Sequence, residues 1–165
     1  MNKIFVLSRF EFEGNMKTNG IDDENVEKYE DLAIISITDN PKNHLFKKDH
    51  DNVLNMTFDD VGEKAYENRH KVKKSLKLKL EDFYRIFSEK DAETIVDFIE
   101  KNKEKTFIIH CEAGISRSGA VGLFIRDFYD WVDKEDFDNR VKNKIYPNML
   151  VLRLLKKEFY EKNYS

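Results

Sequence analysis

A cysteine and an arginine lie close together near residue 110, at a spacing that suits chemistry on an anion. Cys111 and Arg117 are separated by five residues, which are Glu112, Ala113, Gly114, Ile115 and Ser116. A backbone segment of this length can curl around one tetrahedral dianion with its amide groups pointing inward. Gly114 lacks a Cβ atom, so it can take the positive φ that a tight turn needs. The spacing predicts a loop in which the Cys111 thiolate attacks a bound oxyanion.

The flanks of this loop favour the reactive form of the cysteine. An apolar run ending at His110 predicts a strand before the loop, and apolar spacing after it predicts a helix that begins near Arg117. The positive end of that helix would point at the bound anion. Cysteines in such places have pKa values of about 3.5–7.5 instead of about 8.5. Arg117 offers a planar fork that can bind two oxygens of one phosphate, which a lysine cannot do.

The run from His110 to Ser118 resembles the phosphate-binding loop of the cysteine-dependent protein tyrosine and dual-specificity phosphatases, in particular their small prokaryotic or phage branch. Cys111, Gly114, Arg117 and Ser118 stand at the spacing of that family, and His110 directly precedes the cysteine. A strand before the loop and a helix after it complete the resemblance.

The resemblance is specific over residues 106–125 and weaker over 32–60. It implies hydrolysis of phosphotyrosine in a phosphorylated protein, and also of phosphoserine or phosphothreonine if the specificity is dual. The reaction would pass through a phosphocysteine intermediate, without a metal or other cofactor. In the family, the hydroxyl matching Ser118 hydrogen-bonds the sulfur and helps it leave, and the residue matching His110 orients the loop from behind.

A phenolate leaving group has a conjugate acid with a pKa of about 10, so a proton donor should accelerate its departure. Asp59 and Asp60 follow an apolar run similar to the strand that precedes the acid in these phosphatases. We expect Asp60 to be the general acid and Asp59 to be the next candidate, with a simple turn role as the alternative. Asp82 and Asp91 lie nearer to Cys111 in sequence, but Asp91 has the position of a helix-capping residue.

Four short apolar runs predict strands, because they are rich in β-branched and aromatic residues and end in polar ones. They are Lys3–Leu7, Leu32–Ile37, Val53–Phe58 and Thr106–His110. Their apolarity is continuous rather than alternating, which is typical of strands covered on both faces in a parallel sheet. We expect an α/β fold similar to that of the phosphotyrosine phosphatases, with a mostly parallel sheet of about four to five strands flanked by helices.

Helical signals follow the third strand. The run Ser88-Glu89-Lys90-Asp91 has the pattern of a capping box. The residues after it have helical apolar spacing, at Ala92, Ile95, Val96, Phe98 and Ile99. A second helix should run from the loop to about Trp131, and a third should follow Pro147-Asn148.

Ligand sites in such sheets form outside the carboxyl ends of the strands. Parallel strands would gather there polar residues that are far apart in sequence, namely Ser8, Arg9, Thr38, Asp39, Asn40, Asp59, Asp60 and Cys111. We expect the strand that ends near Asp60 to lie beside the strand that ends at Cys111, which would bring the acid to the loop. Arg9 should form a surface salt bridge rather than reach the site.

Residues 61–87 are the least regular part of the sequence. They are rich in basic residues, namely Lys64, Arg69, Lys71, Lys73, Lys74, Lys77 and Lys79. One set of apolar residues has helical spacing, namely Tyr66, Val72, Leu76, Leu80 and Phe83. The alternation of leucines from Leu76 to Leu80 favours a strand instead, and we expect a helix. A basic stretch is most often a solvated face, and the alternative is a rim that attracts acidic, phosphorylated substrates.

The composition limits the classes of protein to which this chain can belong. The chain has 165 residues, of which 40% are hydrophobic and 37% charged, which predicts one folded domain over residues 1–165. The net charge of −3 gives no reason to expect nucleic acid as a partner, and no apolar run approaches the about 18 residues of a membrane helix. A single cysteine fits a reducing compartment, so we expect a cytoplasmic protein. His44, His50 and His70 lack metal-ligand spacing, so no metal site is expected.

Other functions share parts of this loop. A phosphoinositide or RNA 5′-phosphatase acts on a highly charged substrate and tends to carry basic residues inside the loop, where this chain has Glu112 and no lysine. A rhodanese-like sulfur transferase has a cysteine loop but no need of the Arg117-Ser118 pair. A non-catalytic phosphoprotein-binding module would be expected to have lost Cys111 or Arg117. A protein phosphatase is therefore the expected function.

Overall fold

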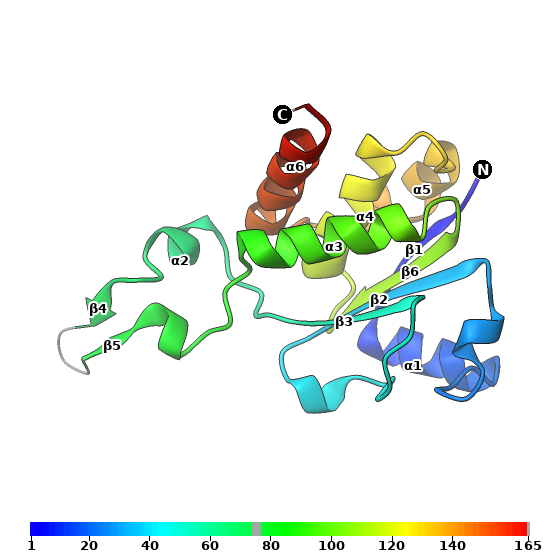
Figure 1. Ribbon diagram of the computed structural model, residues 1–165, viewed down its shortest axis with the longest axis horizontal. Coiled ribbons are helices and arrows are strands. Elements are labelled where there is room, and N and C mark those ends of the chain that lie inside the picture. Colours follow the sequence, from blue (N-terminus) through cyan, green and yellow to red (C-terminus); the bar gives the residue numbers. More distant parts are fainter. Residues whose placement is uncertain (74–76, 165) are drawn as a thin grey trace.

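The computed structural model describes residues 1–73 and 77–164, and a parallel sheet of four strands lies at its centre (Figure 1). The strands are β1 (Ile4–Ser8), β2 (Leu32–Thr38), β3 (Val53–Thr57) and β6 (Thr106–Cys111). Their order in the sheet is β1-β6-β2-β3, and every neighbouring pair is parallel. The predicted α/β class and all four predicted strands are confirmed.

The order of the strands differs from the prediction in one respect. Strand β6, which ends at Cys111, lies between β1 and β2, whereas β3 pairs with β2. Chain order does not reveal this arrangement, because a crossover connection can insert a later strand between earlier ones. The expectation that Asp60 follows a strand beside β6 was therefore wrong. Asp60 reaches the loop through the backbone that continues past the end of β3.

Helices cover both faces of the sheet, as continuously apolar strands require. The α-helices are α1 (Arg9–Thr18), α2 (Glu63–Glu67), α3 (Glu89–Lys101), α4 (Arg117–Phe128), α5 (Lys134–Arg140) and α6 (Met149–Tyr164). Helices α3, α4 and α6 enclose the larger core on one face, and α1 packs on the other face, where Phe12 and Met16 meet Ile34 and Ile108 (Figure 1). None of the helices within the described ranges is both long and apolar enough to cross a membrane.

Three helices occur where apolar spacing predicts them. The Ser88 hydroxyl accepts the amide of Asp91 at 3.2 Å, and the Asp91 carboxylate accepts the amide of Ser88 at 3.0 Å. This is the predicted capping box, and it begins α3, whose predicted apolar stripe is buried. Helix α4 ends at Phe128, slightly earlier than expected, because the backbone of Tyr129 is extended. Helix α6 follows Asn148 as predicted.

The sequence pattern does not predict α1 and α5. Helix α1 has ten residues, of which only Phe12 and Met16 are buried, and α5 buries only Phe137. So few apolar positions cannot establish a helical period in the sequence. The start of α1 is instead marked by a local signal, since the Ser8 hydroxyl accepts the amide of Glu11 at 3.1 Å.

Residues 61–85 form a projection that we call the arm, which leaves the sheet after Asp60 and returns at Arg85 (Figure 1). It contains α2, an antiparallel hairpin and a 3₁₀ turn, the last two made of β4 (Val72–Lys73), β5 (Leu78–Lys79) and η3 (Leu80–Asp82). The other 3₁₀ turns lie outside the arm and are η1 (Val26–Lys28), η2 (Pro41–Asn43) and η4 (Lys142–Lys144).

The helix predicted across residues 61–87 was wrong, because Glu63–Glu67 is the only α-helix among the described residues of this segment. No residue of α2 or η3 is buried, so no packed face selects a helix there. The alternative prediction of a strand, based on the alternating leucines, is confirmed at Leu78, which lies in β5. Lys74 and Leu76, which also belonged to these predictions, lie outside the described residues.

Candidate active site

The loop between β6 and α4 brings Cys111 next to the first turn of α4. Cys111 ends β6 and is 2% exposed, and α4 begins at Arg117. Between them Gly114 has a φ of 72°, the left-handed conformation that glycine adopts without strain. A Cβ atom on Gly114 would lie 2.5 Å from the backbone of Leu7 and of Ser8. Both the turn and the close approach of the loop to the end of β1 therefore require glycine.

We expect Gly114→Ala to lower the free energy of unfolding by about 2–4 kcal/mol, since it adds backbone strain to a steric clash. Gly20→Ala is a matched control, because Gly20 has a φ of 64° but nothing within 4 Å of an added Cβ atom. The control should lose only about 1 kcal/mol. Urea unfolding followed by circular dichroism measures both values. Equal losses would show that contact with β1 contributes nothing to the requirement.

Hydrogen bonds from the loop converge on the Cys111 sulfur. Ser118 Oγ lies 3.0 Å from Cys111 Sγ, and the amides of Ser118, Ile115 and Gly114 also bond the sulfur. Burial by itself raises the pKa of the thiol, because a buried thiolate loses its hydration, but the hydrogen bonds together outweigh burial. The pKa of Cys111 therefore lies below its ordinary value. This environment favours a nucleophilic thiolate.

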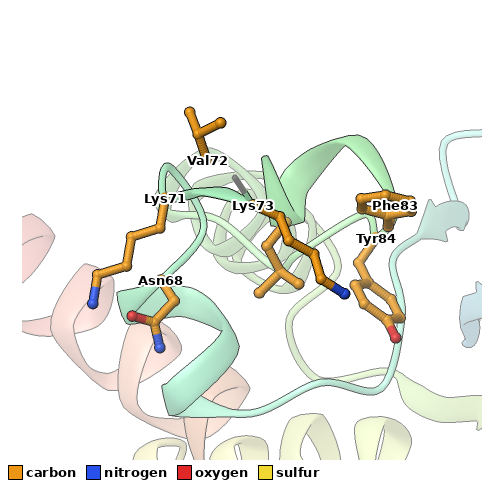
Figure 2. A pocket seen from close by; sticks show the side chains of 7 residues that line it. Asn68, Lys71, Val72, Lys73, Phe83 and Tyr84 are labelled. Atoms are coloured by element: carbon orange, nitrogen blue, oxygen red, sulfur yellow. The ribbon is translucent and has the colours of Figure 1, made fainter. Parts of the chain in front are cut away.

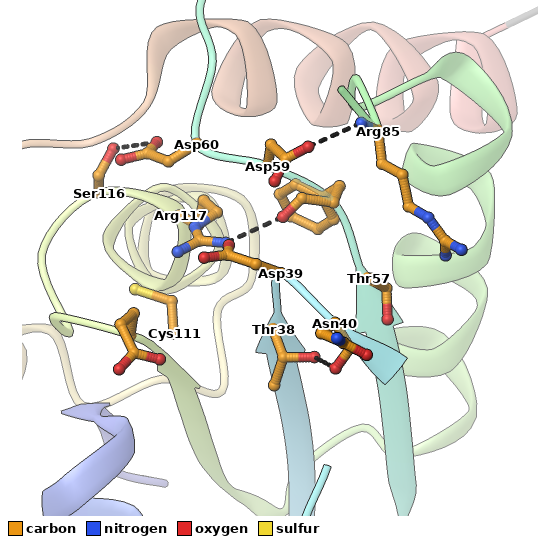
Figure 3. A network of polar contacts seen from close by, with 12 residues as sticks. Thr38, Asp39, Asn40, Thr57, Asp59, Asp60, Arg85, Cys111, Ser116 and Arg117 are labelled. Carbon is orange, nitrogen blue, oxygen red and sulfur yellow. Dashed lines mark hydrogen bonds and ion pairs between the residues drawn. The ribbon is translucent and has the colours of Figure 1, made fainter. Parts of the chain in front are cut away.

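Two neighbouring groups hold one nitrogen of the Arg117 guanidinium. Its Nη1 donates to a carboxylate oxygen of Asp39 and, at 2.9 Å, to the carbonyl of Phe58 (Figure 3). The residue is 5% exposed, and its Nε has no hydrogen-bond partner in the described part of the chain. Leaving a buried donor unpaired costs about 1–3 kcal/mol. An oxyanion in the loop would satisfy this donor and the fork it belongs to.

Asp60 is fixed beside the loop by two donors. Its Oδ1 accepts hydrogen bonds from the Ser116 hydroxyl and from Asn148 Nδ2, both at 2.8 Å. Figure 3 shows Asp60 facing Ser116 on the side of the loop where Arg117 lies. Both hydrogen bonds use Oδ1, so neither donor occupies Oδ2. The structure thus brings Asp60 and the loop together.

The other candidate acids have structural partners elsewhere. The Asp59 carboxylate accepts the amide of Arg85 at 2.7 Å, and the Asp59 amide donates to the Arg85 carbonyl at 2.8 Å. Figure 3 shows Asp59 directed toward Arg85. Asp82 accepts the amide of Lys79 at 2.6 Å in the arm, and Asp91 caps α3. Of the four candidate aspartates, only Asp60 is bonded to the loop.

His110 lies behind the loop in a chain of buried polar groups. Its Nε2 is 2.7 Å from Ser36 Oγ, which is also 3.0 Å from His44 Nδ1, and its Nδ1 is 3.4 Å from the Cys111 carbonyl oxygen. The ring stacks on Phe12 with centroids 4.2 Å apart. Burial lowers the pKa of His110 to about 4, so the imidazole is neutral at neutral pH. A neutral, packed ring suits the supporting role expected of it, which stays a prediction.

The remaining loop residues face outward or bond to neighbouring segments. The Glu112 carbonyl accepts the amide of Arg9 at 3.2 Å, and the Glu112 carboxylate lies 3.8 Å from Arg9 Nη1. The surface salt bridge expected of Arg9 is present with Glu13, and Arg9 also touches the outer side of the loop at Glu112. Ala113 is exposed and Ile115 is 40% exposed, so both lie on the rim of the loop.

Within residues 1–73 and 77–164, no group of three or more histidine, cysteine, aspartate or glutamate side chains is arranged to hold a metal ion. His44 Nε2 lies 3.1 Å from the hydroxyl of Thr57. His50 bonds to Asp23 and His70 to Glu81, at 2.8 and 3.3 Å. These three histidines therefore have hydrogen-bonding partners of their own.

Two residues beside the loop were missed as site residues. Asp39 was grouped only with the polar strand ends, yet it holds Nη1 of Arg117. Asn148 was noted only as a break before α6, yet it joins three segments: Nδ2 bonds Asp60, its amide bonds the Ser116 carbonyl at 3.0 Å, and Oδ1 accepts the amide of Val151 at 3.1 Å. Asparagine before a helix is a common N-cap, so its sequence signal is only that of a cap.

Comparisons with known proteins add little to this geometry. No family model and no curated protein matches the chain in sequence. Among solved structures, the chain is similar to the crystal structure of Cydia pomonella PTP-2 phosphatase, with a TM-score of 0.48 and 17% sequence identity. That similarity covers 95% of this chain and 86% of the other. The chemistry of the site therefore rests on the residues described above.

Proposed function

We propose that this protein hydrolyses phosphate monoesters with Cys111 as the nucleophile, and that its substrates are phosphotyrosine residues of proteins. The proposal rests on the groups that surround the sulfur of Cys111. Cys111 Sγ receives hydrogen bonds from Ser118 and the loop amides. Nε of Arg117, which has no hydrogen-bond partner among the described residues, lies at the end of the same loop. A lowered thiol pKa and anion donors in one place are what nucleophilic attack on phosphate requires.

The reaction would proceed in two steps. Cys111 Sγ attacks phosphorus in line, the bond to the substrate oxygen breaks, and that oxygen takes a proton from Asp60. Water then attacks the phosphocysteine while the Asp60 carboxylate removes a proton from it. The sulfur leaves as a thiolate that the Ser118 hydroxyl stabilises by hydrogen bonding. The loop amides and Arg117 neutralise the phosphoryl oxygens, so no step calls for a metal.

A protein substrate is favoured over a more highly charged one by the residues of the loop rim. Between Cys111 and Arg117 the chain carries Glu112 and no lysine, and Glu112 has a side chain that is 61% exposed. An exposed carboxylate at the rim would repel the extra phosphates of a phosphoinositide or an RNA 5′ end. A binding module without turnover is disfavoured because both Cys111 and Arg117 are present.

The experiment that tests the proposal compares four substrates at one ionic strength: a phenyl phosphate ester, a phosphotyrosyl peptide, a soluble phosphoinositide and a 5′-triphosphorylated RNA. We expect phosphate release from the first two and little from the others. Preference for the phosphoinositide or the RNA would overturn the substrate class and leave the cysteine chemistry standing. Phosphate binding without release from any substrate would instead establish a binding module.

We expect Asp60→Asn to slow phenyl phosphate hydrolysis by about 10²-fold or more, because the leaving phenolate loses its proton donor. Asn keeps the size of the side chain and can still accept hydrogen bonds from Ser116 and Asn148. The loss should shrink for esters of acidic phenols, whose anions leave without a proton. Steady-state rates across a series of substituted phenyl phosphates measure this dependence.

Asp59→Asn is the matched control, since the neighbouring carboxylate bonds Arg85 instead of the loop. It should leave the rate and its dependence on the leaving group nearly unchanged. If Asp59→Asn produced the loss and Asp60→Asn did not, the acid would be Asp59. If neither variant slowed the reaction, Asp39 would be the next carboxylate to test, because it already contacts Arg117.

A further inference from the structure

The arm carries a hollow with apolar walls, outside the two cores of the sheet. Its volume is about 520 Å³, and its lining residues are Asn68, Lys71, Val72, Lys73, Leu80, Phe83 and Tyr84. In Figure 2 the side chains of Phe83 and Tyr84 lie beside that of Lys73, whereas those of Lys71 and Val72 point away from the two rings. Val72, Phe83 and Tyr84 are 54%, 51% and 45% exposed. Exposed apolar side chains that gather around a hollow mark a binding surface, whereas scattered ones do not.

Positive charge borders the hollow. Lys71 and Lys73 line it, and no carboxylate of the described residues lies within ion-pair distance of either. Two carboxylates of the arm near the hollow have other partners: Glu81 lies 3.3 Å from His70, and Asp82 caps the 3₁₀ turn. Figure 2 shows Lys73 extending toward Tyr84, so its charge lies beside an aromatic wall. A complementary ligand has a large apolar group with negative charges next to it.

Among ligands of this kind, an acidic polypeptide fits better than a nucleic acid. An aromatic or aliphatic side chain can enter the hollow while neighbouring carboxylates face Lys71 and Lys73. A nucleic-acid strand carries a charge at every phosphate and binds through many cationic contacts. Lys71 and Lys73 are the cationic residues among those that line the hollow, so a nucleic-acid strand would find few such contacts there.

The arm is joined directly to the candidate active site. It begins one residue after Asp60, whose carboxylate is bonded to Ser116 of the loop. The first residues of the arm contact α6. Arg153 of α6 donates to the Glu63 carboxylate at 2.6 and 3.0 Å, and the Arg153 guanidinium lies 5.5 Å from the centre of the Tyr66 ring. The arm therefore has a fixed base beside the loop, and its hairpin, which contributes to the lining of the hollow, lies beyond that base (Figure 1).

We propose that the hollow of the arm docks an acidic polypeptide segment through one large apolar side chain, and that this segment belongs to the protein substrate. The inference that a polypeptide docks here rests on the hollow and on Lys71 and Lys73, which line it. The identity of the docked chain as a substrate rests on the proposed function. Docking away from the phosphorylated residue raises affinity for the whole protein without altering the chemical step.

Two variants of the intact protein test the proposal: Phe83→Ala, and the double change Lys71→Glu with Lys73→Glu. The substrates are a phenyl phosphate ester and a long phosphotyrosyl peptide that has a phenylalanine flanked by glutamates. We expect both variants to raise KM for the peptide by about tenfold, with kcat unchanged and the phenyl ester unaffected. Tyr160→Ala and Lys101→Glu are the controls, because Tyr160 is 53% exposed on α6 and Lys101 is exposed on α3.

A binding measurement separates this proposal from the proposed function. Fluorescence anisotropy with a labelled, unphosphorylated peptide of glutamates around one phenylalanine reports docking without turnover. Binding that both variants weaken would support docking even if no ester were hydrolysed, in which case only the proposed function would fall. Normal hydrolysis with unchanged KM and unchanged anisotropy in both variants would overturn the docking proposal. Preferential binding of a labelled single-stranded RNA at Phe83 would overturn it as well.

Discussion

Cys111→Ser should abolish hydrolysis of phenyl phosphate, with kcat falling by about 10⁴-fold or more, while the variant still binds inorganic phosphate. The substitution replaces the nucleophile with a hydroxyl that remains protonated at neutral pH. It leaves the loop amides and Arg117 in place, so the anion site persists. Phosphate release measures the loss, and isothermal titration calorimetry with phosphate measures the retained binding.

The single cysteine makes this prediction easy to check by a second route. Because Cys111 is the only thiol in the chain, uptake of iodoacetamide by the wild-type protein reports that residue alone. Alkylation should be fast at neutral pH and should slow when phosphate fills the loop. Residual turnover in Cys111→Ser above about 1% of the wild-type rate, or a thiol that phosphate does not protect, would contradict the cysteine mechanism.

Arg117→Lys should lower kcat by about 10²–10³-fold although the charge is kept. A lysine ammonium can replace one contact of Nη1, but it cannot bond Asp39 and the Phe58 carbonyl and still present two parallel donors to phosphate. The variant should also bind phosphate more weakly. Steady-state kinetics and phosphate titration give the two values.

Arg126→Lys is the matched control for this change. Arg126 also binds a carboxylate with its fork, since Nε and Nη2 lie 3.0 and 2.7 Å from the two carboxylate oxygens of Asp138, but that pair lies outside the loop. Its kinetics should match the wild type. Near-normal turnover of Arg117→Lys would show that Arg117 acts as a point charge and that its planar geometry is unimportant.

The sequence predicts the parts of the fold that a continuous apolar pattern determines. The four strands are short and mostly apolar runs, and α3 combines a capping box with a regular apolar stripe, so both can be recognised in the sequence alone. The position of β6 between β1 and β2 is different, because it depends on how crossovers pack in three dimensions. Helix α1 was missed because it buries only Phe12 and Met16.

The candidate site likewise has residues that the sequence predicts and residues that it does not. Cys111, Arg117 and Ser118 are local in sequence, so their spacing alone predicts that they meet. Asp60 was predicted at the loop for a wrong geometric reason, since β2 separates β3 from β6. Asp39 and Asn148 were missed because their contacts with Arg117 and Asp60 join segments far apart in the chain. Such contacts leave no spacing signal that a single sequence can display.

Asp59 and Arg85 form a clasp of two hydrogen bonds at the base of the arm, so the chain between them is a closed ring. The entropy of closing a flexible ring grows only with the logarithm of its length, and doubling the length costs about 0.6 kcal/mol. The ring can therefore lengthen, shorten or be exchanged between related chains at little thermodynamic cost. Asp60 is the first residue inside the ring, but its carboxylate is held by Ser116 and Asn148, which lie outside the ring. Its position therefore does not depend on what the rest of the ring contains. Evolution can thus vary what the arm recognises separately from the chemistry at Cys111.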